Sequence, residues 1–438
     1  MKLNFYNHFV KQANGVICFN ALTDAYLMLK ENVFSDFEAN FNNLQQFQQD
    51  SPNQYKVLYE NGFILEDDFD EKEHYLNLYY ERKFARNLYQ VIINPTLNCN
   101  LGCWYCYESH QEKSELSDEM INSILLHIEK KYELDKFNHF ALSFFGGEPL
   151  LKPKIVMELI NRVNALAIEK DFKLSVGFTT NGTILPLKLL SLLKNFNTHF
   201  QITLDGVREI HDITRFFKDN NKLGSYDLIL KNIRKITENL RDYGITLRVN
   251  YTSKTIAGLK QVVDDFDFCD RKKVQFSLHR VWQADQAEVD KKLLFEFMNY
   301  AKEHNFIVNY LNIYRQNFCC YADNYNEAVI NYNGDVFKCT ARDFATVTPE
   351  GKLMNNGIIR WNTEKWLDRI SFRLPELCKD CNLLPACGSI CSQRKLEDGE
   401  NISCMLDSEF TKEDYIIHNL NRQLITNKIN AMYSEIPK

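Results

Sequence analysis

The chain has 438 residues, of which 45% are hydrophobic and 13% aromatic, and its formal net charge is −6. A chain of this length and composition can bury cores for two or three domains. Its charges are interspersed and form no basic block, which excludes an extended nucleic-acid groove or an anionic membrane surface as the expected partner.

The sequence carries no sign of export or membrane insertion. Residues Met1 to Val10 lack the basic-then-apolar layout of a signal peptide, and no apolar run approaches the ~20 residues that span a bilayer. We therefore expect a cytoplasmic protein. Its thirteen cysteines are an odd number in a long chain bound for a reducing compartment, which favours metal ligation over disulfides.

Residues 1–85 are predicted to form a small separate module. The apolar runs Tyr6–Lys11 and Val16–Phe19 flank Asn14-Gly15, a dipeptide that suits a hairpin turn. A helical stretch is expected next, with Leu22, Tyr26 and Leu29 at helix spacing. A second helical stretch is expected at Tyr55, Leu58 and Tyr59, followed by an extended segment from Phe63 to Leu65. This order is compatible with a winged-helix-like fold. The acidic run from Glu66 to Glu73 indicates a solvated linker.

From residue 86 to 310 the pattern predicts an α/β fold, an open or partial (β/α)6 barrel. Six strand-like runs alternate with helix-length stretches, the first of which Ser117 can cap, and this rhythm implies a parallel sheet. In such barrels the chemistry lies at the carboxyl ends of the strands. The runs are Val91–Ile93, Phe140–Phe145, Leu174–Phe178, Phe200–Leu204, Leu247–Tyr251 and Val274–Leu278.

Three cysteines, Cys99, Cys103 and Cys106, follow the first strand with the spacing C-x3-C-x2-C. Thiolates at this spacing can hold one cubane cluster and leave its fourth iron open to a substrate or cofactor. The alternative is a zinc knuckle, which normally closes its tetrahedron with a fourth ligand nearby, and His110 is the one close candidate.

This loop resembles the defining motif of the radical S-adenosylmethionine (SAM) superfamily. The resemblance implies a [4Fe-4S] cluster whose open iron chelates SAM and cleaves it to methionine and a 5′-deoxyadenosyl radical. It also implies cofactor contacts at the ends of the following strands, with Glu148 accepting from the methionine amine and Arg215 pairing with the cofactor carboxylate. The implied contacts are Tyr105, Gly146, Gly147, Glu148, Asn181, Asp205 and Arg215.

After residue 310 the alternating rhythm stops, and eight cysteines appear before residue 405. Alone, Cys378-x2-Cys381 would read as a zinc ribbon. The whole field resembles the SPASM extension of radical SAM enzymes, which implies two auxiliary [4Fe-4S] clusters and so three in all. The resemblance assigns Cys378, Cys381, Cys387 and Cys404 to an outer cluster, and Cys339, Cys391 and one or both of Cys319 and Cys320 to an inner one. We expect this domain to span 311–408, with a helix over 409–438.

Cys319 and Cys320 depart from the family pattern because they are adjacent. Neighbouring side chains diverge in an extended chain, so joint ligation needs a sharp turn. Otherwise one cysteine is spare, or the inner cluster keeps an open iron. Cys18 and Cys269 fit no cluster and are expected to be small buried hydrophobes.

SPASM-bearing relatives mostly oxidise or cross-link residues of peptides and proteins. The resemblance therefore implies an oxidoreductase that modifies a ribosomal precursor peptide by hydrogen abstraction and forms a thioether or carbon–carbon link. Its partners would be that peptide, whose leader the 1–85 module captures as an added strand, and a reductant such as flavodoxin or ferredoxin. Asp343 is the candidate proton acceptor.

Two alternatives remain open. One is anaerobic sulfatase maturation, which forms formylglycine, although Thr340 stands where sulfatase activators carry an aspartate. The other is an iron–sulfur electron carrier or scaffold, which would not need the glycine-glycine-glutamate motif or Arg215.

Overall fold

The computed structural model describes residues 1–281, 290–310, 320–371, 374–399, 403–404, 406 and 410–434. The chain forms two compact units. The cysteine-rich unit combines Met1–Phe84, Ile313–Asn324 and Ser371–Gln423, and the sheet unit combines Ala85–Asn312, Tyr325–Ile370 and Leu424–Lys438.

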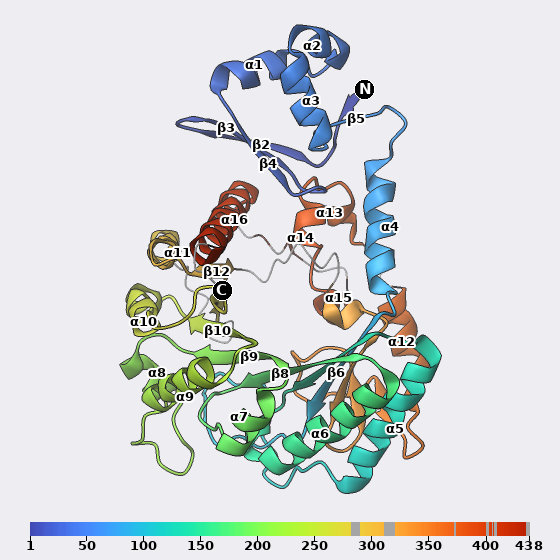
Figure 1. The fold of residues 1–438 in the computed structure, drawn as a ribbon, viewed down its shortest axis with the longest axis vertical. Coiled ribbons are helices and arrows are strands. Elements are labelled where there is room, and N and C mark those ends of the chain that lie inside the picture. Colours follow the sequence, from blue (N-terminus) through green and yellow to red (C-terminus); the bar gives the residue numbers. More distant parts are fainter. Residues whose placement is uncertain are drawn as a thin grey trace. The chain divides into compact units, whose positions relative to one another are not determined.

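The sheet unit is built on one large, mostly parallel sheet (Figure 1). All six strands predicted from the sequence are present, and a seventh, β12, continues their parallel order. The strands are β6 Leu88–Asn94, β7 His139–Phe144, β8 Lys173–Thr180, β9 Asn197–Leu204, β10 Tyr243–Tyr251, β11 Val274–Arg280 and β12 Ile307–Tyr310. The α/β class predicted from the sequence is therefore confirmed.

Four further strands extend this sheet beyond β6. β13 (Glu327–Asn331) pairs with β6 in parallel, and β14 (Asp335–Phe337), β15 (Gly351–Leu353) and β16 (Ile359–Trp361) follow as antiparallel neighbours. This extension was not predicted from the sequence, because three of its strands have only three residues each, too few to show an alternating pattern.

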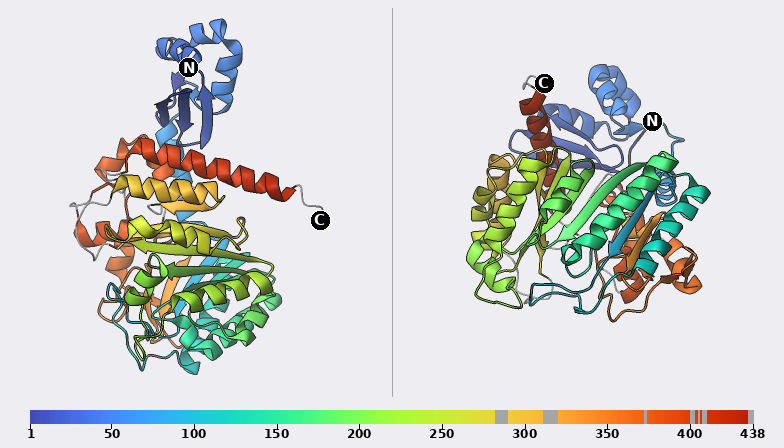
Figure 2. Two further views of the ribbon diagram at one scale, coloured as in Figure 1. Left: turned by 90° about the vertical axis from the view of Figure 1, so that its left-hand side faces the viewer. Right: turned by 60° about the horizontal axis from the view of Figure 1, so that its bottom comes forward.

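Helices connect the parallel strands and lie along one face of the sheet (Figures 1 and 2). Ser117 caps the first of them, as predicted, by accepting a hydrogen bond from the Met120 backbone N–H. The helices of this unit are α5 Asp118–Asp135, α6 Pro153–Lys170, α7 Leu187–Leu193, α8 Arg208–Thr214, α9 Tyr226–Asn239, α10 Lys260–Asp265, α11 Lys291–Glu303 and α12 Thr363–Ile370.

An aromatic stack fixes the register of the central strands. Phe144, Phe178 and Phe200 are paired across β7, β8 and β9, and their ring centroids are 5.4 and 5.2 Å apart. Cross-strand aromatic pairs of this kind stabilise a sheet. Because the pairing is parallel, the carboxyl ends of these strands meet at one edge, where the site residues lie.

The cysteine-rich unit begins with a three-stranded antiparallel sheet and three helices around an aromatic core. The hairpin predicted at Asn14-Gly15 is confirmed. The sheet is made of β2 Asn7–Gln12, β3 Gly15–Asn20 and β4 Ala25–Leu29, and the helices are α1 Glu31–Ala39, α2 Leu44–Asp50 and α3 Pro52–Glu60. A short ladder joins β1 Lys2–Leu3 to β5 Ile64–Leu65, and α4 Glu71–Lys83 follows.

One expectation for this region was wrong and a second was only partly right. The helix predicted at Leu22, Tyr26 and Leu29 is the strand β4, because the Tyr26 ring stacks on Phe19 of β3 at 4.4 Å. A short apolar run does not by itself distinguish helix from strand.

The predicted acidic linker is also partly structured. Asp70 caps α4, and Glu71 is buried, where it accepts hydrogen bonds from the Phe5 backbone N–H and from Lys2. Its burial with a paired lysine makes it a structural residue.

Segments more than 300 residues apart in sequence meet within the cysteine-rich unit. His8 Nε2 lies 3.1 Å from the Asn382 carbonyl oxygen, and Asn419 donates to the Tyr26 hydroxyl at 3.0 Å. The later elements of this unit are η3 Tyr321–Asp323, α13 Glu376–Lys379, α14 Leu384–Cys387, α15 Ser392–Asp398 and the part of α16 (Lys412–Ser434) up to Gln423. None of the described helices combines the length and apolar composition that crossing a membrane requires.

Candidate functional site

The first cysteine loop follows β6 in the sheet unit. Cys99 is buried, Cys103 is half-buried and Cys106 is exposed. Burial raises the pKa of Cys99 to about 12, and burial of the sulfur atom raises that of Cys106 to about 11 although the residue as a whole is exposed. Hydrogen bonding by the backbone of Leu101 and of Glu108 lowers the two values in part. These thiols would therefore release protons on binding a metal.

An antiparallel bridge holds this loop in place. Leu101 pairs with Phe217, the Gly102 backbone N–H donates to the Phe216 carbonyl at 2.9 Å, and the Lys218 N–H donates to Asn100 at 3.0 Å. A Cβ on Gly102 would lie 2.6 Å from the Phe216 ring. The glycine between the first two cysteines is thus required by this close approach.

The two glycines after β7 pack against the beginning of the cysteine loop. A Cβ on Gly146, whose φ is 104°, would lie 2.4 Å from the Thr96 carbonyl oxygen, and one on Gly147 would lie 2.3 Å from that of Asn98. The Glu148 N–H donates to Asn98 O at 2.8 Å. The glycines therefore have a structural reason for their presence besides any approach of a cofactor.

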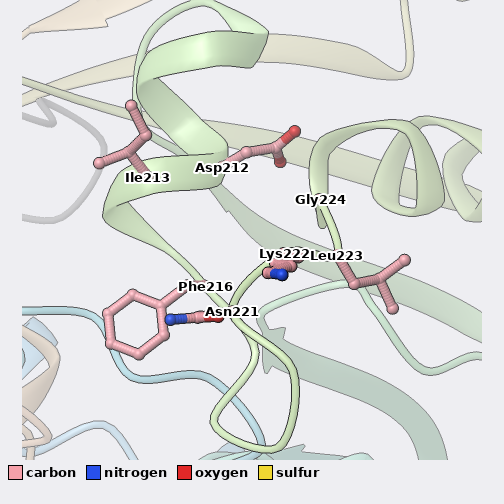
Figure 3. Close-up of a pocket in the computed structure, with 7 residues that line it drawn as sticks. All are labelled: Asp212, Ile213, Phe216, Asn221, Lys222, Leu223 and Gly224. Atoms are coloured by element: carbon pink, nitrogen blue, oxygen red, sulfur yellow. The ribbon is translucent and has the colours of Figure 1, made fainter.

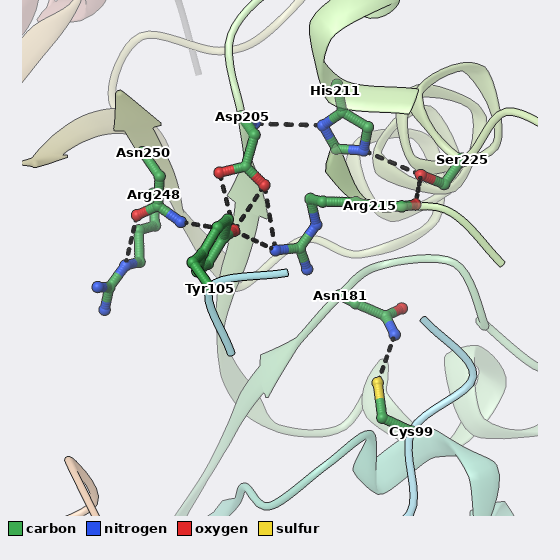
Figure 4. A network of polar contacts seen from close by, with 9 residues as sticks. All are labelled: Cys99, Tyr105, Asn181, Asp205, His211, Arg215, Ser225, Arg248 and Asn250. Atoms are coloured by element: carbon green, nitrogen blue, oxygen red, sulfur yellow. Dashed lines mark hydrogen bonds and ion pairs between the residues drawn. The ribbon is translucent and has the colours of Figure 1, made fainter. Parts of the chain in front are cut away.

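Glu148 is fully buried and joins the ends of β7 and β8. Its carboxylate accepts hydrogen bonds from the Leu150 N–H (2.9 Å), the Thr180 hydroxyl (2.8 Å) and the Asn181 N–H (2.7 Å). Burial raises its pKa to about 6 despite these donors. Asn181 in turn donates to Cys99 Sγ at 3.7 Å (Figure 4). It also donates to Asn100 Oδ1 at 2.8 Å.

Tyr105, Asp205 and Arg215 form one buried network (Figure 4). The Tyr105 hydroxyl donates to Asp205 at 2.6 Å, and Arg215 Nη1 donates to that hydroxyl at 2.9 Å and to Asp205 at 3.3 Å. Burial raises the pKa of Tyr105 well above its usual value. Arg215 Nε is buried, and no hydrogen-bond partner for it is found among the described residues.

Two members of this network were missed by the sequence analysis. Asn250, at the carboxyl end of β10, donates to the Tyr105 hydroxyl at 3.0 Å, and His211 Nδ1 accepts from the Asp205 N–H at 3.2 Å. The position of Asn250 at a strand end was the signal that would have found it.

A comparison with protein families decides the identity of this region. The model of the radical SAM superfamily matches residues 93–266, which include the cysteine loop and all the strand ends described above. Residues 93–266 form a radical SAM domain. This family implies SAM and one [4Fe-4S] cluster as cofactors.

Curated relatives match parts of the chain. An uncharacterised protein of Methanocaldococcus jannaschii is 26% identical over 57% of this chain and 84% of its own length. A cysteine-type anaerobic sulfatase-maturating enzyme of Clostridium novyi is 31% identical over 42% of this chain and 50% of its own length. The chain thus spans about half of that enzyme.

Two solved structures share the fold. Native anSMEcpe with bound AdoMet has a TM-score of 0.56 and 18% identity, covering 79% of this chain and 100% of that chain. Streptococcus suis SuiB bound to precursor peptide SuiA has a TM-score of 0.51 and 14% identity, covering 93% and 99%.

The residues of the radical SAM domain fit the cofactors that the family implies. Three free cysteines, two of them with backbone N–H donors, supply the soft ligands that an iron–sulfur cluster requires. The buried Arg215 Nε offers a donor for a carboxylate. Across the described part of the chain, no three His, Cys or carboxylate side chains are arranged to hold a single metal ion.

The cysteine-rich unit brings four of the later cysteines together. Burial, together with the nearby charges of Cys404, Cys378 and Cys381, raises the pKa of Cys387 to about 12. Burial also raises the pKa of Cys378, and Cys381 and Cys404 add to the rise. The Cys387 thiol lies 3.8 Å from the Ser389 carbonyl oxygen. These four cysteines are those predicted for the outer auxiliary cluster.

The cysteines predicted for the inner cluster are divided between the two units. Cys320 directly precedes η3, Cys391 directly precedes α15, and these two elements pack together in the cysteine-rich unit. Cys339 is buried in the sheet unit just after β14, and Cys319 lies outside the described residues. Cys18 and Cys269 are buried, as expected of small hydrophobes.

Asp343, the candidate proton acceptor, ties the segment after Cys339 to the first cysteine loop. It accepts from the Ser109 N–H (3.0 Å) and hydroxyl (2.7 Å), and from Thr346 and Ala345. Partial burial opposes ionisation, but these donors lower its pKa below the usual value. Nearby Glu108, which the sequence analysis missed, has its pKa raised to about 8 by burial and by Asp343.

A surface pocket of about 430 Å³ lies beside Phe216, the residue before the bridge from Phe217 to the cysteine loop (Figure 3). None of the residues predicted to contact SAM lines it. Its lining residues are Asp212, Ile213, Phe216, Asn221, Lys222, Leu223 and Gly224.

Proposed function

We propose that this chain is a cytoplasmic radical SAM maturase that cross-links residues of a ribosomal precursor peptide through a thioether or carbon–carbon bond. When bound, SAM and its cluster would supply a 5′-deoxyadenosyl radical that removes a hydrogen atom from the peptide. The observation that carries this proposal is the small sheet of residues 1–84. Its strands β2 and β4 pair only with β3 among the described residues, so each has an edge to which an extended leader peptide can add.

The likeness to SuiB supports this choice of substrate. SuiB, solved with a precursor peptide, aligns over 93% of this chain, whereas anSMEcpe aligns over 79%. The fold shared with SuiB therefore extends over more of the chain than the radical SAM domain, and this wider match is what supports the proposal.

The roles of the chain's own residues follow from their contacts. Cys99, Cys103 and Cys106 would hold the radical cluster, and Arg215 would orient the cofactor carboxylate through its buried Nε. Glu148 and Asn181 would form the wall of the cofactor site between β7 and β8.

We further propose two auxiliary clusters in the later cysteine field. Cys378, Cys381, Cys387 and Cys404 would hold one, and Cys339, Cys391 and Cys320 or Cys319 the other. These clusters would take up the surplus electron of an oxidative ring closure. A flavodoxin or ferredoxin would supply the electron that starts the reaction.

A second candidate function, sulfatase maturation, is favoured by the Clostridium novyi relative at 31% identity. One experiment separates the two. The anaerobically reconstituted protein is incubated with SAM, a reductant and either a peptide encoded beside its gene or a cysteine-bearing sulfatase peptide. The maturase proposal requires loss of two hydrogens from the first peptide by mass spectrometry. Aldehyde formation in the second peptide alone would reject it in favour of sulfatase maturation.

A further inference from the structure

His110 lies beside the first cysteine loop without belonging to the predicted ligand set. Its Nε2 is 3.7 Å from Cys106 Sγ, and its Nδ1 is 2.9 Å from Lys218 Nζ. Lys218 is exposed. The three side chains therefore form a row from Cys106 through His110 to Lys218.

The chemistry of the donors determines where His110 carries its proton. A lysine ammonium has three N–H donors and no acceptor, so Lys218 donates to the lone pair on Nδ1. A neutral imidazole holds one proton, which must then reside on Nε2. His110 accordingly donates Nε2–H toward Cys106 Sγ.

The same arrangement argues against His110 as a zinc ligand. A histidine that ligates a metal donates its second ring N–H to a carboxylate, a carbonyl or water. Here the second nitrogen faces the cation Lys218. If Nε2 bound a metal while Nδ1 accepted from Lys218, the ring would hold no proton, which is unfavourable for an imidazole.

The backbone holds Lys218 in this position. The Lys218 N–H donates to the Asn100 carbonyl at 3.0 Å, and the Gly102 N–H donates to the Phe216 carbonyl at 2.9 Å. These two bonds flank the bridge between Leu101 and Phe217. The backbone of Lys218 is therefore bonded to the same loop that contains Cys106, the cysteine that His110 contacts.

We propose that His110 and Lys218 are positioning residues that raise the reduction potential of the cluster held by Cys99, Cys103 and Cys106. Reduction adds one electron and no proton, so negative charge grows on the cluster and its sulfurs. Hydrogen bonds to the sulfurs are one of the means by which a protein sets this potential. The Lys218 charge strengthens the His110 donor by polarising the ring. The inference rests on the proposed cluster and adds two residues that tune its potential.

The test is a redox titration of the anaerobically reconstituted full chain, with dithionite as the one-electron donor, followed by electron paramagnetic resonance. The signal to follow is the one that changes when SAM is added, because an open iron can accept that ligand. His110→Phe should lower the equilibrium constant for reduction about tenfold, which is about 59 mV for a one-electron couple. Lys218→Met should shift it less in the same direction.

Conservative variants separate tuning from packing. His110→Gln keeps an N–H donor and Lys218→Arg keeps a charged donor, so both should stay near the wild-type potential. Lys222→Met is the matched control. It removes another exposed lysine of the same loop, one whose side chain lines the surface pocket, and it should leave the reduction potential unchanged.

Wild-type potentials in both His110→Phe and Lys218→Met, at full iron content, would overturn the proposal. If His110→Phe loses its iron, the Lys218 variants provide the test, because Lys218 is exposed. Equal reduction potentials in Lys218→Met and Lys218→Arg would then overturn the proposal. Zinc that the wild-type protein binds and His110→Phe does not would also contradict the proposal. A wild-type protein without any SAM-responsive signal would instead refute the proposed function, a result that is visible before any variant is made.

Discussion

Glu148 illustrates how a residue of the predicted cofactor site also stabilises the fold. It accepts hydrogen bonds from groups on both sides of the β7 and β8 ends while it is fully buried. Glu148→Ala would leave these donors unpaired, and we expect it to lower the free energy of unfolding by about 3 kcal/mol. Glu148→Gln, which keeps one accepting oxygen, should cost less, as measured by denaturant unfolding of the metal-free protein.

The pKa of Glu148 gives this test a pH dependence. Its value in the folded chain, about 6, is above the ordinary value of 4.5. A raised pKa means that the folded state favours the protonated carboxyl, so this stabilising contribution is complete below about pH 4.5 and is lost as the pH rises through about 6. The loss should be absent from Glu148→Gln. An identical pH profile in the two proteins would contradict the assignment.

Asp343 has the contacts of a positioning residue. Its four hydrogen bonds hold Ser109 of the first cysteine loop and the turn after Cys339. Asp343→Asn can retain most of these bonds but is a far weaker base, so we expect it to keep most of the SAM cleavage and product formation. Asp343→Ala should lower both, together with iron content. Loss of product in the Asn variant at full iron content would instead support a proton-acceptor role.

Among the structural elements, the cysteine loop packs against the segment after α8, where Gly102 lies against the Phe216 ring. A double-mutant cycle can test this contact. Gly102→Ala would place a methyl group against the Phe216 ring, and overpacking of this kind typically costs about 1 to 3 kcal/mol. We expect it to lower iron retention and the melting temperature. Adding Phe216→Ala should recover part of the loss, because the two sites are in contact. If the effects of the two substitutions on melting temperature and iron retention simply add, the two residues are not energetically coupled and this interpretation is wrong.

The sequence predicted the parallel strands and the positions of the site loops because those signals are local. Alternating apolar runs, the cysteine spacing and the glycine-glycine-glutamate turn are all contained within a few residues. The strand β4 was mistaken for a helix, since its structure depends on the contact of Tyr26 with Phe19 in the preceding strand. Glu71 was assigned to a linker for the same reason: its partners, Lys2 and Phe5, lie far away in sequence. The contacts of His110 and Asn250 likewise required the fold.

In the molecule as a whole, the N-terminal module and the cysteines after residue 370 belong to one compact unit. His8, Tyr26 and Asp24 contact Asn382, Asn419 and Gln423. Deleting residues 1–80 should therefore remove the proposed outer auxiliary cluster and also the proposed capture of a peptide leader. SAM cleavage should continue, because the radical SAM domain lies in the other unit.

Iron content and leader affinity measure the two effects of this deletion. His8→Ala is the milder control, since it removes one contact and leaves the module intact. A deletion variant that keeps all of its iron would show that the module does not support the late cysteines. Unchanged affinity for the full-length precursor would reject its role in leader binding.

We expect this chain to use SAM for radical chemistry at Cys99, Cys103 and Cys106. The most direct measurement is 5′-deoxyadenosine formed by the reduced, reconstituted protein and by a variant with all three cysteines replaced by alanine. The wild type should form it, and the variant should form none, because the loop then lacks the thiolates that hold a cluster. Robust 5′-deoxyadenosine from the triple variant would contradict the account.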